Sequence, residues 1–123
     1  MATITTHHYV LAVPDAQRTA RFFVEKLGFE SCPVADKGWR FVSKDGFKVM
    51  LGSCPDAIHP VKLGDHSYFA YFVVDDVDGY FQEIQARNVE TLSSPADKPW
   101  GMREFGLRTP DGHRIMIGQS TGK

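Results

Sequence analysis

The chain has 123 residues, a mass of 13.8 kDa and a formal net charge of −1, with 14 Lys and Arg residues against 15 Asp and Glu residues. This length corresponds to one ordinary domain, and the balanced charge provides no basic field for binding nucleic acid. Hydrophobic residues make up 42% and charged residues 24%, which predicts a folded soluble domain and excludes a disordered chain.

The sequence offers no sign of a membrane or secreted protein. No apolar run approaches the roughly 20 residues that span a bilayer, and the polar residues 1–6 lack the features of a signal peptide. Cys32 and Cys54 are too few for a disulfide framework and form no CxxC motif. We therefore expect a cytoplasmic protein with reduced thiols.

The two halves of the sequence repeat one pattern of elements. The first half predicts a strand over residues 5–13, then a helix capped by Asp15 and ended by Gly28. Residues 39–43 and 47–52 then predict a hairpin around an Asp-Gly turn. The helix has one apolar stripe at three- and four-residue spacing, which consists of Ala16, Ala20, Phe23 and Leu27.

The second half predicts the same units in the same order. A strand over residues 68–75 leads into a helix capped by Asp76, and Asn88 stands where Gly28 ends the first helix. A short strand over residues 89–93 precedes a hairpin of residues 102–108 and 114–118. The buried face of this helix is predicted to comprise Val77, Tyr80, Phe81 and Ile84.

These motifs identify a resemblance. Residues 8–15, with Phe22, Phe23 and Leu27-Gly28-Phe29, resemble the opening of the vicinal oxygen chelate superfamily of glyoxalase I, bleomycin resistance proteins and extradiol dioxygenases. The resemblance covers about residues 5–119. It implies an α+β fold in which two tandem βαβββ modules, residues 5–54 and 67–119, form curved mixed sheets around a cup. The helices lie on the convex side, residues 1–123 form a single domain, and a homodimer is implied.

The resemblance also indicates where the metal-dependent members place their ligands. The four corresponding positions here are His8, Met50, Phe69 and Met116. Two thioethers and a phenyl ring do not replace the carboxylate and imidazole donors that such metals need. We therefore expect no metal and no cofactor.

Strand alternation predicts the lining of the cup independently. Starting from the four positions above, it adds Val10, Ala12, Lys48, Gly52, Tyr71, Val73, Arg114 and Gly118, together with Glu104, Gly106 and Arg108 from residues 102–108. Such a wall is aromatic and rich in thioethers, which suits an organic ligand.

Two tryptophan motifs place the resemblance nearest the bleomycin-resistance-like branch. They are Gly38-Trp39 and the segment of residues 100–105, which contains Trp100, Arg103, Glu104 and Phe105. The predicted ligand-binding residues are His8, Trp39, Met50, Phe69, Tyr71, Trp100, Arg103, Glu104 and Met116.

The resulting hypothesis is a small-molecule-binding protein that sequesters an aromatic or antibiotic-like compound, as drug-binding resistance proteins do. The alternative is a lyase, isomerase or dioxygenase that uses His8 in a rearranged metal site, or His8 or Glu104 as a metal-free general base. A third alternative is a partner subunit whose dimer surface matters more than its cup.

Structural interpretations of the same residues stay open alongside these functions. One such interpretation is a closed core filled by Met50, Phe69 and Met116. Another is an ordinary ion pair on the hairpin between Arg103 and Glu104. His113 follows an Asp-Gly turn and is expected to face solvent.

Overall fold

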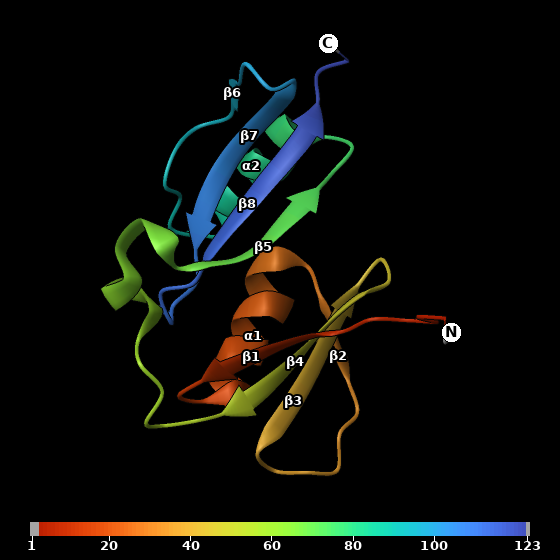
Figure 1. The fold of residues 1–123 in the computed structure, drawn as a ribbon, viewed down its shortest axis with the longest axis vertical. Coiled ribbons are helices and arrows are strands. Elements are labelled where there is room, and N and C mark those ends of the chain that lie inside the picture. Colours follow the sequence, from red (N-terminus) through yellow and green to blue (C-terminus); the bar gives the residue numbers. More distant parts are fainter. Residues whose placement is uncertain (1–2, 123) are drawn as a thin grey trace. The chain divides into compact units, whose positions relative to one another are not determined.

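The structure is a computed structural model that describes residues 3–122, and for residue 65 the backbone alone. It divides into two compact units, one ending at Ala57 and the other beginning at Ile58. Each unit contains one α-helix and one four-stranded mixed sheet (Figure 1). This confirms the predicted α+β fold of two tandem modules.

The first unit runs β1 (Tyr9–Val13), α1 (Ala16–Leu27), β2 (Glu30–Cys32), β3 (Trp39–Lys44) and β4 (Phe47–Ser53). Its sheet has the order β1-β4-β3-β2, in which β1 is parallel to β4 and the other pairs are antiparallel. The first strand begins at Tyr9, later than the predicted residue 5.

The predicted ends of α1 are confirmed. The Asp15 carboxylate accepts hydrogen bonds from the amides of Gln17 and Arg18, at 3.0 and 3.3 Å. Gly28 ends the helix in the left-handed conformation, with φ 82°. The hairpin turn is also as predicted, since Asp45 and Gly46 both have positive φ, 51° and 86°. Such a two-residue turn matches the twist of the strands that it joins.

The second unit begins with a 3₁₀ segment, η1 (Pro60–His66). It continues through β5 (Tyr68–Val73), α2 (Val77–Ala86), β6 (Ala96–Asp97), β7 (Met102–Arg108) and β8 (Arg114–Ser120). The sheet order is β5-β8-β7-β6, with β5 parallel to β8, so that the two units share one topology. In Figure 1, α2 lies behind β7 and β8.

Two predictions about the second unit are wrong. Residues 89–93 form no strand and contribute only one isolated bridge, between Thr91 and Leu107. The outer strand is β6 instead, in which Ala96 pairs with Glu104 and Asp97 with Arg103 of β7. The buried face of α2 is also narrower than predicted, since Val77 and Ile84 are buried while Tyr80 and Phe81 are only half-buried.

Each unit has its own core between helix and sheet. In the first unit the completely buried side chains include Val13, Phe23, Leu27, Val42, Val49 and Leu51. In the second they include Val77, Ile84, Phe105, Leu107, Ile115 and Ile117. Because strand side chains alternate, the opposite row of each sheet faces away from the helix of its own unit. None of the helices in residues 3–122 is both long and apolar enough to span a membrane.

His113 is buried, which contradicts the expectation that it faces solvent. Its amide donates to the Thr109 hydroxyl at 3.0 Å, and Asp111 in the same turn is completely buried. The imidazole of His59 packs directly over Gly112, where a side chain would collide with it. The turn is therefore covered by the segment that leads into η1, a contact between residues distant in sequence.

This burial predicts a pH-dependent stability. Burial lowers the pKa of His113 below 6.5, an effect that the charge of Asp111 opposes and that of His59 reinforces. The unfolded chain therefore binds a proton at a pH where the folded chain does not, and the free energy of unfolding should fall as pH decreases below about 6.5. Urea unfolding between pH 7.5 and 5.5 should show this fall, and a His113→Gln variant should show a shallower one. An equally steep fall in the variant would contradict this assignment.

Candidate functional site

The face of each sheet that points away from its helix carries several of the predicted binding residues, namely Trp39, Met50, Tyr71, Glu104 and Met116. We call these the first open face and the second open face. The first comprises Val10 and Ala12 of β1, Lys48, Met50 and Gly52 of β4, and Trp39, Phe41 and Ser43 of β3. The second comprises Tyr71 and Val73 of β5, Arg114, Met116 and Gly118 of β8, and Glu104, Gly106 and Arg108 of β7.

Trp39 dominates the first open face. Its indole lies over Gly52, because a β-carbon placed on that glycine would lie 3.0 Å from the Cη2 atom of Trp39. Glycine thus gives the ring room to lie flat on the sheet. Phe41 lies edge-on to Trp39, with ring centroids 6.5 Å apart, and stands opposite Met50 in the register.

Phe41 lies on the first open face and is absent from the predicted ligand-binding residues. The signal was available, because Phe41 lies two positions after Trp39 on the same strand and so shares its face. The Lys48 ammonium lies 6.0 Å from the centroid of the Phe41 ring. The first open face therefore combines two aromatic rings and one thioether with a single cation at its edge.

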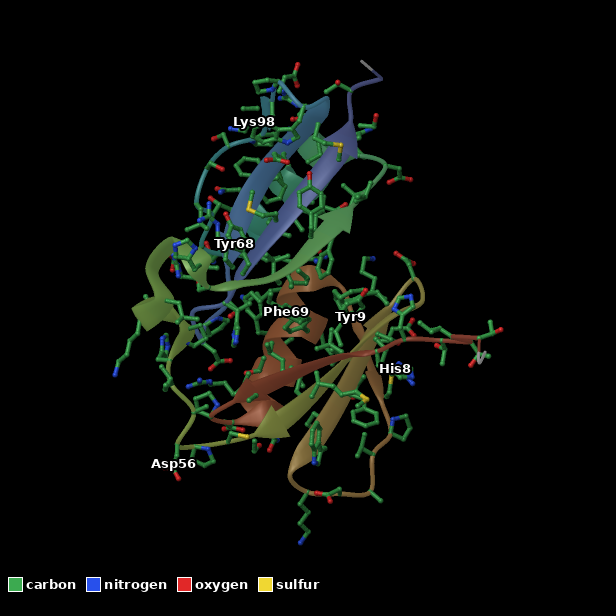
Figure 2. All side chains as sticks on the ribbon, in the orientation of Figure 1. His8, Tyr9, Asp56, Tyr68, Phe69 and Lys98 are labelled. Carbon is green, nitrogen blue, oxygen red and sulfur yellow. The ribbon has the colours of Figure 1, made fainter. Side chains whose placement is uncertain are left out.

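His8 lies just before β1 and is exposed (Figure 2). The next residue on its predicted face, Val10, is 60% exposed and pairs with Met50. The imidazole of the neighbouring His7 contacts the Tyr9 ring, with centroids 5.6 Å apart. His8 thus borders the first open face, at the end where the chain enters the sheet.

Glu104 is the polar centre of the second open face. The Tyr71 hydroxyl donates to its Oε2 atom at 2.6 Å, and the Trp100 indole N–H donates to the same atom at 3.4 Å. Glu104 is only 6% exposed, whereas the Trp100 and Tyr71 side chains are 65% and 44% exposed. The sequence analysis predicted all three, and the structure brings them together.

Two glycines make this arrangement possible. Tyr71 reaches Glu104 across Gly118, where any side chain would collide with the phenol. A β-carbon on Gly106 would lie 3.1 Å from the Met116 sulfur, so Met116 occupies the space beside that glycine. The sheet surface under these side chains is therefore nearly bare backbone.

Tyr71 is held as a neutral donor. Partial burial, the hydrogen bond to Glu104 and the charge of that carboxylate raise the pKa of Tyr71 to about 12. The phenol therefore stays protonated well into the basic pH range and donates a hydrogen bond to Glu104 throughout it.

Phe69 departs from simple alternation. The register of β5 against β8 shifts between Tyr68 and Ala70, so that Tyr68 pairs with Arg114 while Tyr71 pairs with Met116. The guanidinium carbon of Arg114 lies 4.9 Å from the Tyr68 ring centroid. Phe69 is half-buried, with its ring centroid 6.3 Å from that of His113. Tyr68 and Phe69 are both labelled in Figure 2, near the start of β5.

Arg103 does not share the second open face with Glu104. Adjacent residues of a strand point to opposite sides, and the Arg103 guanidinium binds Asp78 of α2, at 2.9 Å, and Asp97 of β6, at 3.1 Å. Hydrogen bonds to these two carboxylates raise its pKa further above the ordinary value. The interpretation of Arg103 and Glu104 as an ion pair is therefore wrong.

The side chains at the four family positions do not fit a hard metal ion. His8 offers a ring nitrogen, whereas Met50, Phe69 and Met116 offer neither a nitrogen nor an oxygen ligand. Within either unit, no three His, Cys, Asp or Glu side chains of the described residues are placed to share a metal. Cys32 and Cys54 are both free thiols, and the Cys32 thiol donates to the Ser43 hydroxyl at 3.4 Å.

Comparisons with known proteins agree with this architecture. The family model of the Glyoxalase/Bleomycin resistance protein/Dioxygenase superfamily matches residues 5–117. No curated protein sequence matches significantly.

Solved structures share the fold at low sequence identity. A superfamily member from Sphaerobacter thermophilus has a TM-score of 0.76 at 23% identity, over 96% of this chain and 98% of its own. The bleomycin resistance determinant encoded on transposon Tn5 has a TM-score of 0.76 at 22% identity, over 95% and 98%. The bleomycin-binding protein of Streptomyces verticillus, solved with copper(II)-bleomycin, has a TM-score of 0.69 at 24% identity, over the whole of both chains.

Proposed function

The chain belongs to the Glyoxalase/Bleomycin resistance protein/Dioxygenase superfamily, and from this premise we propose that it binds a small aromatic organic molecule without a metal ion. The observation that carries the proposal is the pair of open faces, on which half-buried Trp39, Phe41, Met50 and Met116 lie beside the exposed ring of Tyr71. The two modules, residues 5–54 and 67–119, and the single domain of residues 1–123 remain part of this proposal.

The composition of these faces supports an aromatic ligand. Small-molecule sites are mostly apolar and carry a few polar groups that fix orientation. Trp39, Phe41 and Met50 offer stacking and thioether contacts, and Tyr71, Glu104 and Trp100 offer hydrogen-bonding groups. The donor set argues against metal-dependent chemistry, because thioethers and phenyl rings do not neutralise a dication.

Binding by sequestration fits the names of two structural neighbours, a bleomycin resistance determinant and a bleomycin-binding protein. An antibiotic-like compound is therefore part of the proposal, as are a homodimer and a cytoplasmic location. Light scattering combined with size-exclusion chromatography tests the homodimer directly.

A compound panel tests the function. Aromatic and glycopeptide compounds, bleomycin among them, are added to untagged protein, and tryptophan emission and melting temperature are recorded. We expect at least one compound to quench emission and raise the melting temperature, because a ligand that binds only the folded state stabilises it. Trp39→Phe and Trp100→Phe variants then assign the quenching to one ring. A broad panel with neither effect would contradict the proposal.

The enzymatic alternative rests on Glu104, a carboxylate held on an open face and therefore a candidate general base. Mass spectrometry of the panel compounds after incubation tests it. A product that forms with the native chain and not with Glu104→Gln would favour this alternative, whereas unchanged compounds would favour binding alone.

A further inference from the structure

The Glu104 carboxylate lacks a positive partner. It is 6% exposed, and both groups that donate to it, the Tyr71 hydroxyl and the Trp100 indole N–H, are neutral. Among the residues that the structure describes, no Lys, Arg or His side chain forms an ion pair with it. The residue is buried as a whole, but its Oε1 atom is not among the buried polar atoms that lack a partner and therefore stays accessible. A carboxylate with low exposure and no positive partner is stabilised when a cation binds to its accessible oxygen.

The nearest basic residue in the sequence is not available for this role. Arg103 points to the helix side of β7, where its guanidinium holds Asp78 and Asp97 at 2.9 and 3.1 Å. Arg108, on the same face as Glu104, pairs with Glu90 at 3.6 Å and donates to the Gly112 carbonyl at 3.2 Å. Both arginines of β7 therefore pair with carboxylates other than that of Glu104.

One carboxylate oxygen of Glu104, Oε1, has no hydrogen-bond donor among the described side chains. Both described hydrogen bonds end on Oε2. The two donors themselves carry exposed rings, with Trp100 65% and Tyr71 44% exposed. Aromatic faces attract cations, and they do so best beside a carboxylate, where the two attractions add.

We propose that Glu104, Trp100 and Tyr71 form a subsite for a positively charged nitrogen of the ligand, an ammonium or amidinium group attached to the aromatic body. The charged nitrogen would donate to Glu104 Oε1 and lie against the two rings. Gly106 gives room to the Met116 thioether and Gly118 to the Tyr71 phenol, and the Met116 thioether would contact the aromatic body of the ligand. This inference rests on the proposed function and adds to it the charge of the ligand.

Three matched probes test the inference by calorimetric titration at pH 7. 2-(Aminomethyl)naphthalene is a cation, 2-(hydroxymethyl)naphthalene is its neutral isostere, and 2-naphthoate is an anion. We expect the ammonium to bind at least tenfold more tightly than the alcohol, and the naphthoate to bind most weakly, since a charge-assisted hydrogen bond is about twice as strong as a neutral one. The indole N–H signal of Trp100 should shift on titration with the ammonium.

Glu104→Gln is the decisive variant, because glutamine keeps an acceptor for Tyr71 and removes the charge. We expect it to lose the roughly tenfold preference for the ammonium and to lose less affinity for the alcohol, whose hydroxyl can still donate to the glutamine oxygen. Glu83→Gln makes the same change of net charge on the exposed side of α2 and should keep the preference. Melting temperatures of both variants establish that each is folded.

The outcomes separate this inference from the proposed function. Equal affinity for ammonium and alcohol, or a preference that survives Glu104→Gln, would overturn the cationic subsite and leave aromatic binding intact. A failure of all three naphthalenes to bind would overturn the subsite as well, whereas the proposed function is decided by its own compound panel. An equal loss of affinity for all three probes in Glu104→Gln would also overturn the subsite, because it would show that Glu104 acts through the structure of the site and not through its charge.

Discussion

Replacing Phe105 with alanine is expected to lower the free energy of unfolding of the second unit by about 3–5 kcal/mol. The Phe105 side chain is completely buried between α2 and the sheet, and its ring lies edge-on to that of Phe81, with centroids 5.1 Å apart. Truncation loses the burial of the ring and leaves a cavity that the rigid neighbours fill only in part. Urea unfolding followed by far-ultraviolet circular dichroism measures this loss.

Phe105→Leu is the matched control for that experiment. Leucine retains most of the buried volume, so the loss should be clearly smaller than for alanine. Equal losses in the two variants would contradict the role of the cavity and would point to the ring contact with Phe81 instead.

Replacing Trp39 with alanine is expected to weaken binding of an aromatic ligand by roughly tenfold to a hundredfold. The indole lies flat over Gly52 on the first open face and is the largest side chain there. Its removal takes away the stacking surface and the apolar area that a planar ligand would cover. Calorimetric titration with the tightest compound of the panel measures the effect.

Trp39→Phe separates stacking from the size of the site. Phenylalanine retains an aromatic face at the same position, so most of the affinity should remain. Both variants are measured below the melting temperature of the less stable one. Unchanged affinity in Trp39→Ala would place the ligand away from the first open face.

The local elements followed from local chemistry. Asp15 and Asp76 cap their helices as predicted, because a short carboxylate satisfies free amides of the first turn without help from distant residues. Gly28 and Asn88 adopt positive φ, and so do Asp45 and Gly46, since these residue types tolerate left-handed backbone. Such decisions involve residues a few positions apart, and a single sequence contains them.

The predictions that are wrong concern places where segments distant in the sequence contact each other. His113 was expected in solvent, but His59 packs over its turn from more than fifty positions earlier. Phe69 was expected in step with Tyr71, but a register shift in β5 places Tyr68 opposite Arg114 instead. The missing strand at residues 89–93 depended on how long that segment stays in register with β7.

In the candidate site, too, features set by nearby residues are predictable and features set by distant segments are not. Alternation from residue types correctly placed Glu104 and Gly106 on one side of β7 and Phe105 and Leu107 on the other. The sequence could not show that Arg103 would be bound by Asp78 and Asp97, because those carboxylates come from α2 and β6. It also could not show that Tyr71 and Trp100 would donate to one oxygen of Glu104.

The repeat, the helix caps, the turns and the apolar side of each strand can thus be derived from the amino-acid sequence, since they depend on backbone preference and on the period of the pattern. The strand register, the burial of His113 and the partners of each charged group become visible in the folded chain alone. Those features depend on contacts between segments far apart in the chain, and the carboxylate of Glu104 acquired its neutral surroundings through such contacts.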